Sequence, residues 1–310
     1  MPSTAEAHRD DPYPTRHQGS MRVLDRQDPV VYGDNIASTA LNENQIDAYR
    51  ERGYLLLPRL LDRSEIEALI ADSHRLRANI AVDDDSVITE PRSETVRSIF
   101  RLQARSRIFA ALFRDERLLN VARYLLGGNV YIHQTRLNFK PGFVGKEFYW
   151  HSDFETWHAE DGMPRMRAVS VSINLTENTH LNGPLMLIPG SHRRYVSCAG
   201  VTPDNHFRES LRAQHYGVPD PATLELLVRD GGIDAAIAPA GSATFFDCNI
   251  MHGSNSNITP FARTNIFVVY NSVDNTMQEP YGAARPRPDF LAERSDTRPL
   301  TPTRGGIRGD

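Results

Sequence analysis

The stretch Gly127–Lys140 reads GGNVYIHQTRLNFK, and the hydrophobic pattern of the chain changes at its start. From Val130 onward, apolar and polar residues alternate with a period of two, which is typical of a β-strand with one buried face. Turns rich in Pro and Gly separate this run from four later ones. The later runs that predict strands lie at residues 168–177, 185–188, 243–246 and 265–271. The second half of the chain is therefore expected to form a β-sandwich or jelly roll.

The sequence before these glycines has a helical period instead. Asn42 with Gln45 predicts a capping box at the start of one helix, and Ser64 with Glu67 repeats that signal before a second apolar run. A third helical pattern spans Ile108–Leu126. We therefore predict a mainly β protein with flanking α-helices packed outside the sheets.

The length and composition fit a single large domain. The chain has 310 residues, of which 40% are hydrophobic, enough for a sizeable core. We expect this domain to span residues 37–293. Residues 1–36 are polar and are expected to be disordered or loosely packed, and residues 294–310, rich in Arg, Pro, Thr and Gly, are expected to form a flexible tail.

Charge and cysteine content exclude several classes of protein. The net charge of −4 gives no reason to expect nucleic acid or anionic lipid as a partner. The apolar runs are much shorter than the roughly 18 residues that a membrane span requires. Cys198 and Cys248 are the only cysteines, too few for a disulfide framework or a Cys-rich zinc site. A cytoplasmic protein fits these observations best, with Cys248 as a small buried side chain.

His151 and Asp153 stand two positions apart in a sequence that begins like a strand. Residues i and i+2 of a strand project from the same face, so one metal ion would be able to bind both. A second histidine, His252, follows the predicted strand at 243–246. Two histidines and one carboxylate that leave other positions open are the ligand set of non-haem Fe(II) oxygenases. The sequence therefore predicts an iron site at these three residues.

Two other pairs compete for the same role. His8 and Asp10 repeat the spacing, but they lie in the polar N-terminal segment, where no strand pattern would hold them. His158 and Glu160 are a second competitor, although they run into a predicted turn. Neither pair has a later histidine that matches it as His252 matches His151 and Asp153.

A candidate for binding a co-substrate follows the second histidine. Arg263 lies at the start of the last predicted core strand. A guanidinium group binds carboxylates in a bidentate manner. A co-substrate with one carboxylate for the arginine and a 2-oxo acid for the iron would fit, and 2-oxoglutarate has both groups.

Polar side chains also line one face of the predicted strand at residues 130–140. The period of two places Gln134, Arg136, Asn138 and Lys140 on that face. The face would either be exposed to solvent or, in a barrel whose interior is the active site, line the co-substrate pocket. The residues alone leave both interpretations open.

Longer motifs around these positions resemble a known family. The stretch Phe148–Pro164 is similar to the characteristic motif of the ectoine hydroxylases, a group within the phytanoyl-CoA dioxygenase-like Fe(II)/2-oxoglutarate oxygenases. Asn182–Leu185 and Pro189–His192 resemble a Gly-Pro-Leu and Pro-Gly-Ser-His element of the wider group. His252–Ser254, with Arg263 beyond it, resembles that group's second histidine ligand and 2-oxoglutarate arginine. The resemblance runs from about Leu41 to Leu291.

The resemblance implies a fold, a metal and a co-substrate. The core would be a double-stranded β-helix of the jelly-roll or cupin type, with Fe(II) bound by His151, Asp153 and His252. O2 and 2-oxoglutarate would be co-substrates, the latter held by Lys140 and Arg263. Asn138 and Ser254 would assist them. No catalytic residue beyond the iron ligands is implied.

It also implies a substrate and a reaction. Ectoine would contact Gln134 and Trp157, with Thr156 nearby and Arg287 closing over it, although Arg285 competes for that last role. The product would be 5-hydroxyectoine, released with succinate and CO2 as part of osmotic stress protection. Such enzymes are often homodimers.

The chemistry of these residues suits that substrate. Ectoine carries an amidinium group and one carboxylate on a small ring, and an indole face such as Trp157 attracts a cation. The alternative for Trp157 is packing in the core. The carboxylate at Asp153 argues against a halogenase, in which a small residue opens that position to halide, and the absence of His-Glu-x-x-His argues against a zinc hydrolase. A sister hydroxylase for another small zwitterion and a non-catalytic solute-binding protein remain as alternatives.

Overall fold

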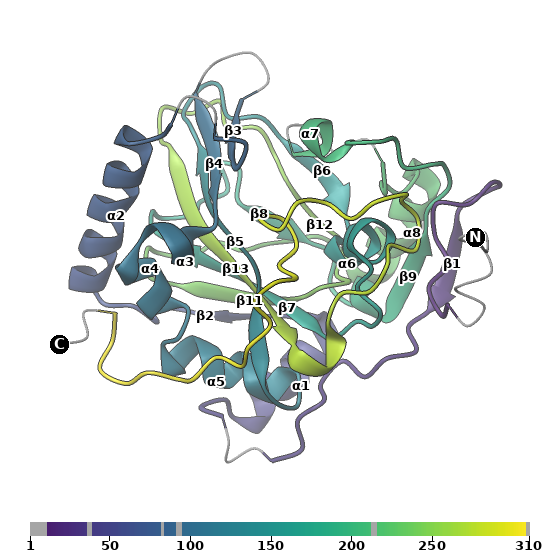
Figure 1. Cartoon of the computed structure of the whole chain (residues 1–310), viewed down its shortest axis with the longest axis horizontal. Helices are drawn as coiled ribbons and strands as arrows, with labels where there is room; N and C mark the ends of the chain where they lie inside the picture. The colour runs from purple at the N-terminus through teal and green to yellow at the C-terminus, as the bar shows by residue number, and fades with distance from the viewer. Residues whose placement is uncertain (1–10, 36–38, 82–83, 91–94, 212–215, 308–310) are drawn as a thin grey trace.

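The computed structural model describes residues 11–35, 39–81, 84–90, 95–211 and 216–307 (Figure 1). A seven-stranded sheet forms its centre, with the strand order β2-β11-β7-β13-β5-β4-β3. The strands in chain order are β2 (Tyr54–Leu57), β3 (Val87–Thr89), β4 (Val96–Phe100), β5 (Val130–Lys140), β7 (Ala168–Asn174), β11 (Ala243–Asp247) and β13 (Arg263–Ser272). All neighbouring pairs are antiparallel.

A four-stranded sheet packs against the first, with the order β10-β8-β12-β6. Its strands are β6 (Phe148–His151), β8 (Leu185–Leu187), β10 (Asp234–Ala235) and β12 (His252–Ser254). Leu185 and Leu187 of this sheet form one buried cluster with Phe246 and Phe267 of the larger sheet. The two layers and their flanking helices confirm the predicted jelly-roll architecture.

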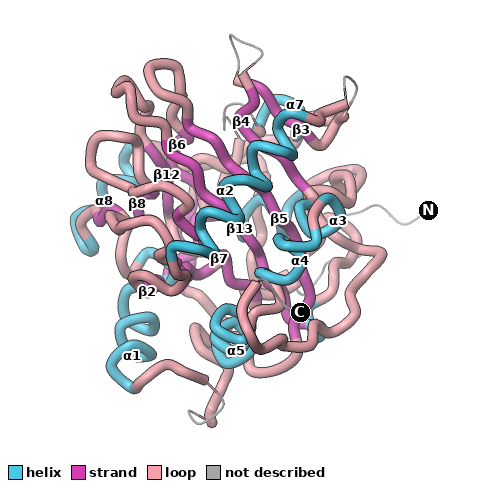
Figure 2. Tube along the Cα trace, turned by 90° about the vertical axis from the view of Figure 1, so that its left-hand side faces the viewer, coloured by secondary structure: helices cyan, strands magenta, loops and turns pink. Residues whose placement is uncertain are grey.

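Helices cover the outer face of the larger sheet, where α2, α3 and α4 lie across its strands (Figure 2). Leu69 and Leu76 of α2 share the main hydrophobic core with Leu137 and Ile266 of the sheet. The helices are α1 (Glu43–Arg52), α2 (Arg63–Ala78), α3 (Leu102–Arg105), α4 (Arg107–Leu112), α5 (Glu116–Leu125), α6 (Asp153–Thr156), α7 (Phe207–Ser210) and α8 (Pro221–Gly231). Shorter turns are the π-helical η2 (Trp157–Asp161) and the 3-10 turns η3 (Ser191–Arg193) and η4 (Val273–Asn275).

The helix boundaries agree with the sequence in part. The capping box of Asn42 and Gln45 opens α1 as predicted. The second one is displaced by two residues, because Asp62 and Glu65 cap α2 in place of Ser64 and Glu67. The third helical pattern is divided into α4 and α5, since the side chain of Asp115 caps a new helix within it.

The N-terminal segment differs from the expectation of a loose tail. Residues 11–35 pack along the domain, and β1 (Arg22–Asp25) pairs with β9 (Arg194–Ser197) as a separate two-stranded sheet. Tyr13 is fully buried and Arg16 is nearly so. The polar composition misled the prediction because these side chains are buried by pairing with distant parts of the chain. Residues 1–10 lie outside the described part.

The C-terminal segment also packs against the domain. The backbone of Leu300 donates to Val130, Thr303 forms a bridge with Asp115, and Ile307 lies in the main core. The expectation of a flexible tail at residues 294–310 is therefore corrected for residues 294–307. Within the described parts of the chain, no helix is long and apolar enough to cross a membrane.

Candidate metal centre and co-substrate pocket

The three predicted metal ligands come together between two neighbouring strands. His151 ends β6 and His252 begins β12, and the two residues are directly paired in the sheet. Asp153 is the first residue of α6, so the chain leaves the strand between the two ligands. The spacing argument thus named the correct residues, but a strand end followed by a helix, and not strand alternation, places them together.

The ligand atoms are close enough for one ion. The Nε2 atoms of His151 and His252 lie 3.7 and 3.8 Å from Oδ1 of Asp153. One ligand atom from each residue can be chosen so that all three lie within 4.8 Å of one another, and no other group of three His, Cys, Asp or Glu residues in the described chain does this. Among the described His, Cys, Asp and Glu residues, this group of three is the one that can hold a metal ion.

Hydrogen bonds fix which nitrogen of each imidazole is available. Nδ1 of His151 lies 2.8 Å from the carbonyl of Tyr149, and Nδ1 of His252 lies 3.0 Å from the carbonyl of Ile250. A carbonyl only accepts, so each Nδ1 carries the proton and each Nε2 keeps its lone pair toward Asp153. Burial, followed by the neighbouring His151, lowers the pKa of His252 to about 4. Neutral imidazoles suit a divalent ion.

The carboxylate is held in its ionised form. Burial by itself would raise the pKa of Asp153, but His252 and His151 outweigh it and hold the pKa well below its usual range. The hydroxyl of Ser170 on β7 donates to Oδ2 at 3.1 Å. Oδ1 faces the two imidazoles, which completes a set of one anionic and two neutral ligands that fits Fe(II).

A cavity rich in cations opens beside this centre. His151 and His252 lie at one end of it, and four cationic side chains from the strands line it: Arg97, Arg136, Lys140 and Arg263. Glu90 is the only carboxylate among the described lining residues, and it pairs with Arg97 at 3.1 Å. The polar face of β5 therefore lines an internal pocket, and the solvent-facing interpretation of that face is wrong.

Within the described chain, Arg97 is paired with Glu90, but Arg136, Lys140 and Arg263 form no ion pair. The Nε atoms of Arg136 and Arg263 are buried and make no hydrogen bond within the described chain. Burial, followed by Arg136, lowers the pKa of Arg263 to about 10. The guanidinium of Arg136 lies over the ring of Phe267, 4.6 Å from its centroid. A buried arginine without an acceptor is costly, so this pocket is built for an anion.

Lys140 sits opposite Arg263 in the sheet. Its Nζ donates to Ser254 Oγ at 2.8 Å and to the carbonyl of Asn255 at 2.6 Å. Burial, followed by Arg263, lowers the pKa of Lys140 to about 6. Asn138 also lines the pocket and donates to Ser98 at 3.3 Å. The structure thus gathers all four predicted co-substrate residues at one cavity.

The predicted substrate residues are not part of the lining of that cavity. Trp157 begins η2, is only 3% exposed, and packs edge-on against His133 with 5.0 Å between ring centroids. Gln134 donates to the carbonyl of Leu291 at 2.8 Å. The hydroxyl of Thr156 is buried without a hydrogen-bond partner among the described residues. The interpretation of Trp157 as a packing residue is therefore compatible with its burial, while the unsatisfied hydroxyl beside it points to a missing polar ligand.

Arg287 has a partner that the sequence did not predict. Its Nε and Nη2 donate to both carboxylate oxygens of Asp161, at 2.9 and 2.5 Å. Its remaining nitrogen, Nη1, makes no hydrogen bond or ion pair within the described chain. Arg285 and Arg287 both line a second cavity, between η2 and residues 202–207. Any contact of Arg287 with a substrate would therefore use one nitrogen and not the full guanidinium fork.

The competing metal pair is engaged elsewhere. Nδ1 of His158 lies 2.7 Å from the carbonyl of Met163 and Nε2 lies 3.1 Å from Asp11. Glu160 pairs with Arg16 at 3.2 Å. These contacts occupy both side chains, so His158 and Glu160 stabilise the helix and do not serve as metal ligands. The pair of His8 and Asp10 lies outside the described residues.

The sequence did not predict several residues of the co-substrate pocket and of the metal centre. Arg97 and Glu90 line the pocket from β4 and the loop before it, and Ser170 supports the carboxylate ligand. The β-bulge that brings His133 against Trp157 was also missed: the register shifts there between Val269 and Tyr270. Cys248 is fully buried, as expected.

Comparison with known proteins supports this description. The family model described as phytanoyl-CoA dioxygenase matches residues 49–265. The ectoine dioxygenase of Bordetella parapertussis is 52% identical over 94% of this chain and 95% of its own length. The ectoine dioxygenase of Sphingopyxis alaskensis is 50% identical over 96% of this chain and 97% of its own length.

Solved structures give the same result. The crystal structure of EctD from S. alaskensis with 2-oxoglutarate and 5-hydroxyectoine superimposes with a TM-score of 0.88 and 47% identity, over 96% of this chain and 99% of that one. The carbocyclase SnoK from nogalamycin biosynthesis, which depends on α-ketoglutarate, superimposes with a TM-score of 0.62 at 18% identity, over 89% of this chain and 98% of that one. The second likeness concerns the fold alone.

Proposed function

The chain belongs to the phytanoyl-CoA dioxygenase family, and on that premise we propose that it hydroxylates ectoine to 5-hydroxyectoine with Fe(II), 2-oxoglutarate and O2. Each turnover consumes one 2-oxoglutarate and one O2 and releases one succinate and one CO2. The observation that carries the proposal is the group of buried cations Arg136, Lys140 and Arg263 beside the metal ligands, because a dianion would neutralise it.

The metal would be held by His151, Asp153 and His252. Fe(II) supplies the activation of O2 when it is bound. The hydrogen-bonded Nδ1 atoms keep both imidazoles neutral and directed at the ion, and Asp153 contributes the one negative charge. Three ligands on one face leave the remaining positions to the co-substrate and O2.

The co-substrate would bind through both of its ends. The distal carboxylate of 2-oxoglutarate would meet Arg263 and Lys140, which are cross-strand partners and share the pocket with Ser254. Asn138 would add a neutral donor. The 2-oxo acid end would reach the metal centre, where Arg136 lies in the same pocket with an unused Nε. Charge-assisted hydrogen bonds in such a dry site each contribute about 1.5–3 kcal/mol.

Ectoine would bind on the Trp157 side of the metal ligands. The indole face of Trp157 would attract the amidinium, and the unsatisfied hydroxyl of Thr156 would provide a hydrogen bond. The side-chain NH2 of Gln134 donates to the carbonyl of Leu291, so its amide oxygen would orient the ring of ectoine. The unused nitrogen of Arg287 would meet the substrate carboxylate, in preference to Arg285, because the bond to Asp161 already fixes its position.

Asp153→Ala tests the metal assignment. The variant removes the only anionic ligand, so bound iron and hydroxylation should both fall by about 100-fold or more, while circular dichroism stays unchanged. Ser170→Ala is the matched comparison, because it keeps the carboxylate and removes one hydrogen bond to it, so both values should fall by about 10-fold, less than in Asp153→Ala. Iron content near that of wild type in Asp153→Ala would refute the assignment.

The substrate is tested by titrating ectoine into iron-loaded, 2-oxoglutarate-bound protein in the absence of O2. Calorimetry should show saturable binding, with no reaction to obscure it. The same titration with other small zwitterions distinguishes a sister hydroxylase. Absence of ectoine binding would refute the substrate while leaving the oxygenase assignment in place.

Two further properties are part of the proposal. The absence of a disulfide framework in the sequence favours a cytoplasmic location. A homodimer is implied by the family resemblance, and light scattering coupled to size-exclusion chromatography would measure a mass near twice 34.9 kDa if it forms. A monomer mass would refute the dimer without affecting the proposed reaction.

A further inference from the structure

One short turn, residues 247–250, lies behind the metal centre and contacts the segments that carry its ligands. The carbonyl of Ile250 accepts the hydrogen bond from Nδ1 of His252 at 3.0 Å. The carbonyl of Cys248 accepts one from the backbone N–H of Phe154, the residue after Asp153, at 2.8 Å. Two of the three ligands are therefore oriented by consecutive parts of the same turn.

Asn249 connects the turn to the remaining ligand. Its Oδ1 accepts a hydrogen bond from Ser152, the residue between His151 and Asp153, at 3.0 Å. Its Nδ2 donates to the carbonyls of His192 and Arg194, at 3.0 Å each. The amide of Asn249 thus holds the peptide between two ligands at a fixed distance from the sheet edge.

The turn itself is fixed by the carboxylate of Asp247. Oδ1 of Asp247 accepts from the backbone N–H of Asn249 at 2.8 Å, and the Asp247 carbonyl accepts from Ile250 at 3.1 Å. The side chain is 3% exposed. A carboxylate buried to this degree needs a cation, and none of the metal-site residues supplies it.

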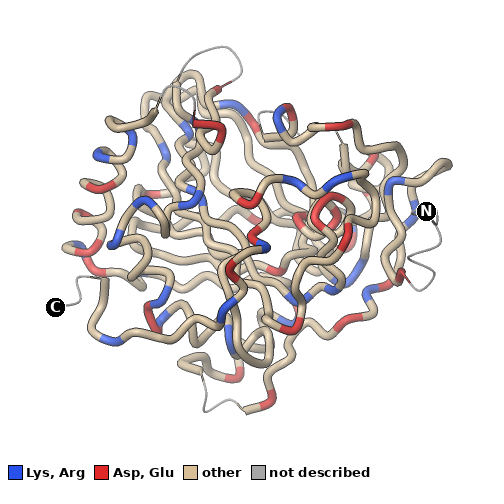
Figure 3. Tube along the Cα trace, viewed as in Figure 1, with Lys and Arg blue, Asp and Glu red and all other residues tan. Residues whose placement is uncertain are grey.

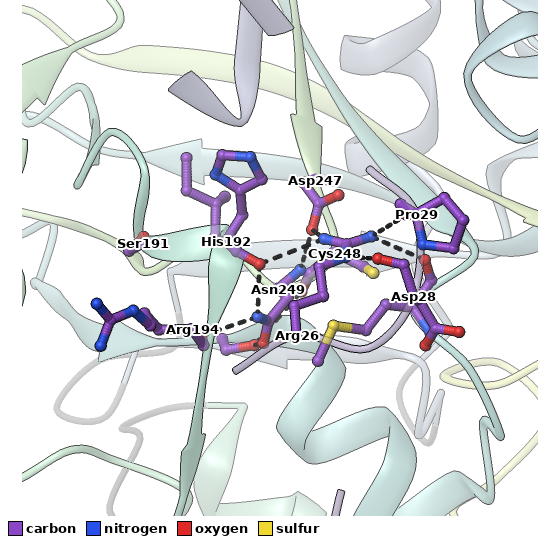
Figure 4. Close-up of polar contacts among 12 residues, drawn as sticks. Arg26, Asp28, Pro29, Ser191, His192, Arg194, Asp247, Cys248 and Asn249 are labelled. Atoms are coloured by element: carbon purple, nitrogen blue, oxygen red, sulfur yellow. Dashed lines mark hydrogen bonds and ion pairs between the residues drawn. The ribbon is translucent and has the colours of Figure 1, made fainter. Parts of the chain in front are cut away.

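Arg26 supplies that cation from the N-terminal segment, one residue after β1. Its Nη1 donates to Asp247 at 2.8 Å, and its other hydrogens reach four backbone carbonyls. The carbonyls belong to Asp28, Pro29, Met166 and His192. Figure 4 shows the guanidinium enclosed between Asp247 and these carbonyls, with Asn249 beside it. The guanidinium is therefore held rigidly, and its position fixes that of Asp247.

We propose that Arg26 is a positioning residue for the metal, which sets metal affinity by locking the turn at residues 247–250. The inference rests on the proposed iron site. Arg26 lies outside residues 49–265, the part that matches the family model, so the N-terminal segment adds a support to the shared core. Residues that hydrogen-bond directly to metal ligands typically change metal affinity by about 10- to 100-fold when replaced, and Arg26 acts one step further out, through Asp247 and the turn, so the lower end of that range is expected.

Arg26→Gln tests the proposal on the metal-free, full-length protein. Co(II) serves as the probe, because its visible absorption reports ligand geometry and needs no O2 chemistry. We expect the dissociation constant for Co(II) to rise by about 10-fold, with a weaker visible band. The melting temperature will also fall, since the variant leaves Asp247 buried without its cation.

Two further variants separate positioning from stability. Arg117→Gln is the matched control: Arg117 of α5 binds Glu65, Asp115 and the carbonyl of Leu60, and none of the turn residues. It should lower the melting temperature but keep the Co(II) dissociation constant within twofold of wild type. The double variant Arg26→Gln/Asp247→Asn removes both charges, so stability should recover in part while metal affinity stays low.

Three results would count against the proposal or against the metal site on which it rests. A Co(II) dissociation constant in Arg26→Gln within twofold of wild type would overturn the proposal, whatever the melting temperature. If that variant does not fold, Arg26→Lys keeps the charge but loses most carbonyl contacts, and affinity equal to wild type there would overturn the proposal too. Failure of the wild-type protein to bind Co(II) would instead refute the proposed metal site itself.

Discussion

Two regions of this protein bury several charges, and they differ in whether those charges are paired. In the co-substrate pocket, Arg136 and Arg263 have unpaired Nε atoms and no carboxylate partner within the described chain. On the α6–η2 helix, where acidic residues gather (Figure 3), Glu155 binds Arg16 at 2.6 Å and Asp161 binds Arg287 at 2.5 Å. The buried cations of the first region need a ligand to neutralise them, whereas the buried charges of the second are already paired with one another.

The pKa directions reflect the same difference. Burial, followed by neighbouring cations, lowers the pKa of Lys140 and of Arg263. Burial also opposes the charge of Arg16 and Arg287, but Glu155 and Asp161 outweigh it and raise both values above the usual range. The unpaired cations of the pocket are therefore the ones whose charge an anionic ligand would stabilise, whereas Arg16 and Arg287 already have carboxylate partners.

The largest expected effect is a contrast in stability between the two regions. Arg16→Gln leaves Glu155 buried without its cation, while Glu160 keeps Arg287, and should lower the free energy of unfolding by about 3–5 kcal/mol. Arg263→Gln removes one of several crowded cations and should leave the metal-free protein as stable as wild type, or more stable. Urea unfolding of the two variants measures this, and equal losses would break the distinction between the regions.

Co-substrate binding should show the reverse contrast. Arg263→Gln loses a charge-assisted pair worth about 1.5–3 kcal/mol, so the KM for 2-oxoglutarate should rise about 10- to 150-fold. The KM for ectoine should change much less. Steady-state kinetics with each substrate varied in turn gives both values. Equal increases in the two KM values would indicate a general defect and contradict the assignment of Arg263.

Trp157, which is proposed to bind ectoine, gives a further test of the comparison between the two regions. Trp157→Ala should weaken ectoine binding by about 2- to 30-fold through loss of a cation–π contact of 0.5–2 kcal/mol, and Trp157→Phe should keep part of it. Met163→Ala is the control, because Met163 packs in the same buried cluster and is not among the proposed ectoine contacts. Unchanged ectoine affinity in Trp157→Ala would make Trp157 a packing residue.

The pH dependence of co-substrate binding gives a further test of the unpaired pocket. Lys140 has a pKa of about 6 in the free pocket, so it loses its charge as the pH rises above 6. A dianion binds the charged form better, so binding takes up a proton and the apparent Kd of 2-oxoglutarate should rise with pH, by up to about tenfold per unit. Calorimetry between pH 6 and 8 measures it.

The two lysines of the chain provide the control for that prediction. Lys140→Met should remove the pH dependence along with part of the affinity. Lys146→Met should keep the dependence, although Lys146 lines the same cavity. A pH profile that persists in Lys140→Met would show that another group titrates.

The grouping of the metal ligands and of the residues proposed for the co-substrate was predictable in part from local spacing and in part from the family resemblance. His151 and Asp153 are separated by one residue, and the alternation of β5 placed Asn138 and Lys140 on one face. Arg263 was recognised by its position at the start of a strand. These features depend on a few neighbouring residues, which is the range over which sequence patterns inform.

The supports of the site were not predictable, because they join distant parts of the chain. Arg16 and Glu155 are 139 positions apart, and Arg26 and Asp247 are 221 positions apart. The polar sequence at residues 1–36 gave the opposite expectation, since buried arginines and exposed ones look the same without their partners. The bulge at His133 left no sequence signal either, because it depends on the register of the neighbouring strand.

The central claim is that the cation-lined pocket and the metal ligands together hydroxylate ectoine. The direct test is to incubate the iron-loaded protein with 2-oxoglutarate, O2 and ectoine, and to quantify succinate and 5-hydroxyectoine by mass spectrometry. The account predicts equal molar amounts of the two products, and little succinate when ectoine is replaced by other compatible solutes. Succinate that forms at the same rate without ectoine, or no 5-hydroxyectoine at all, would contradict it.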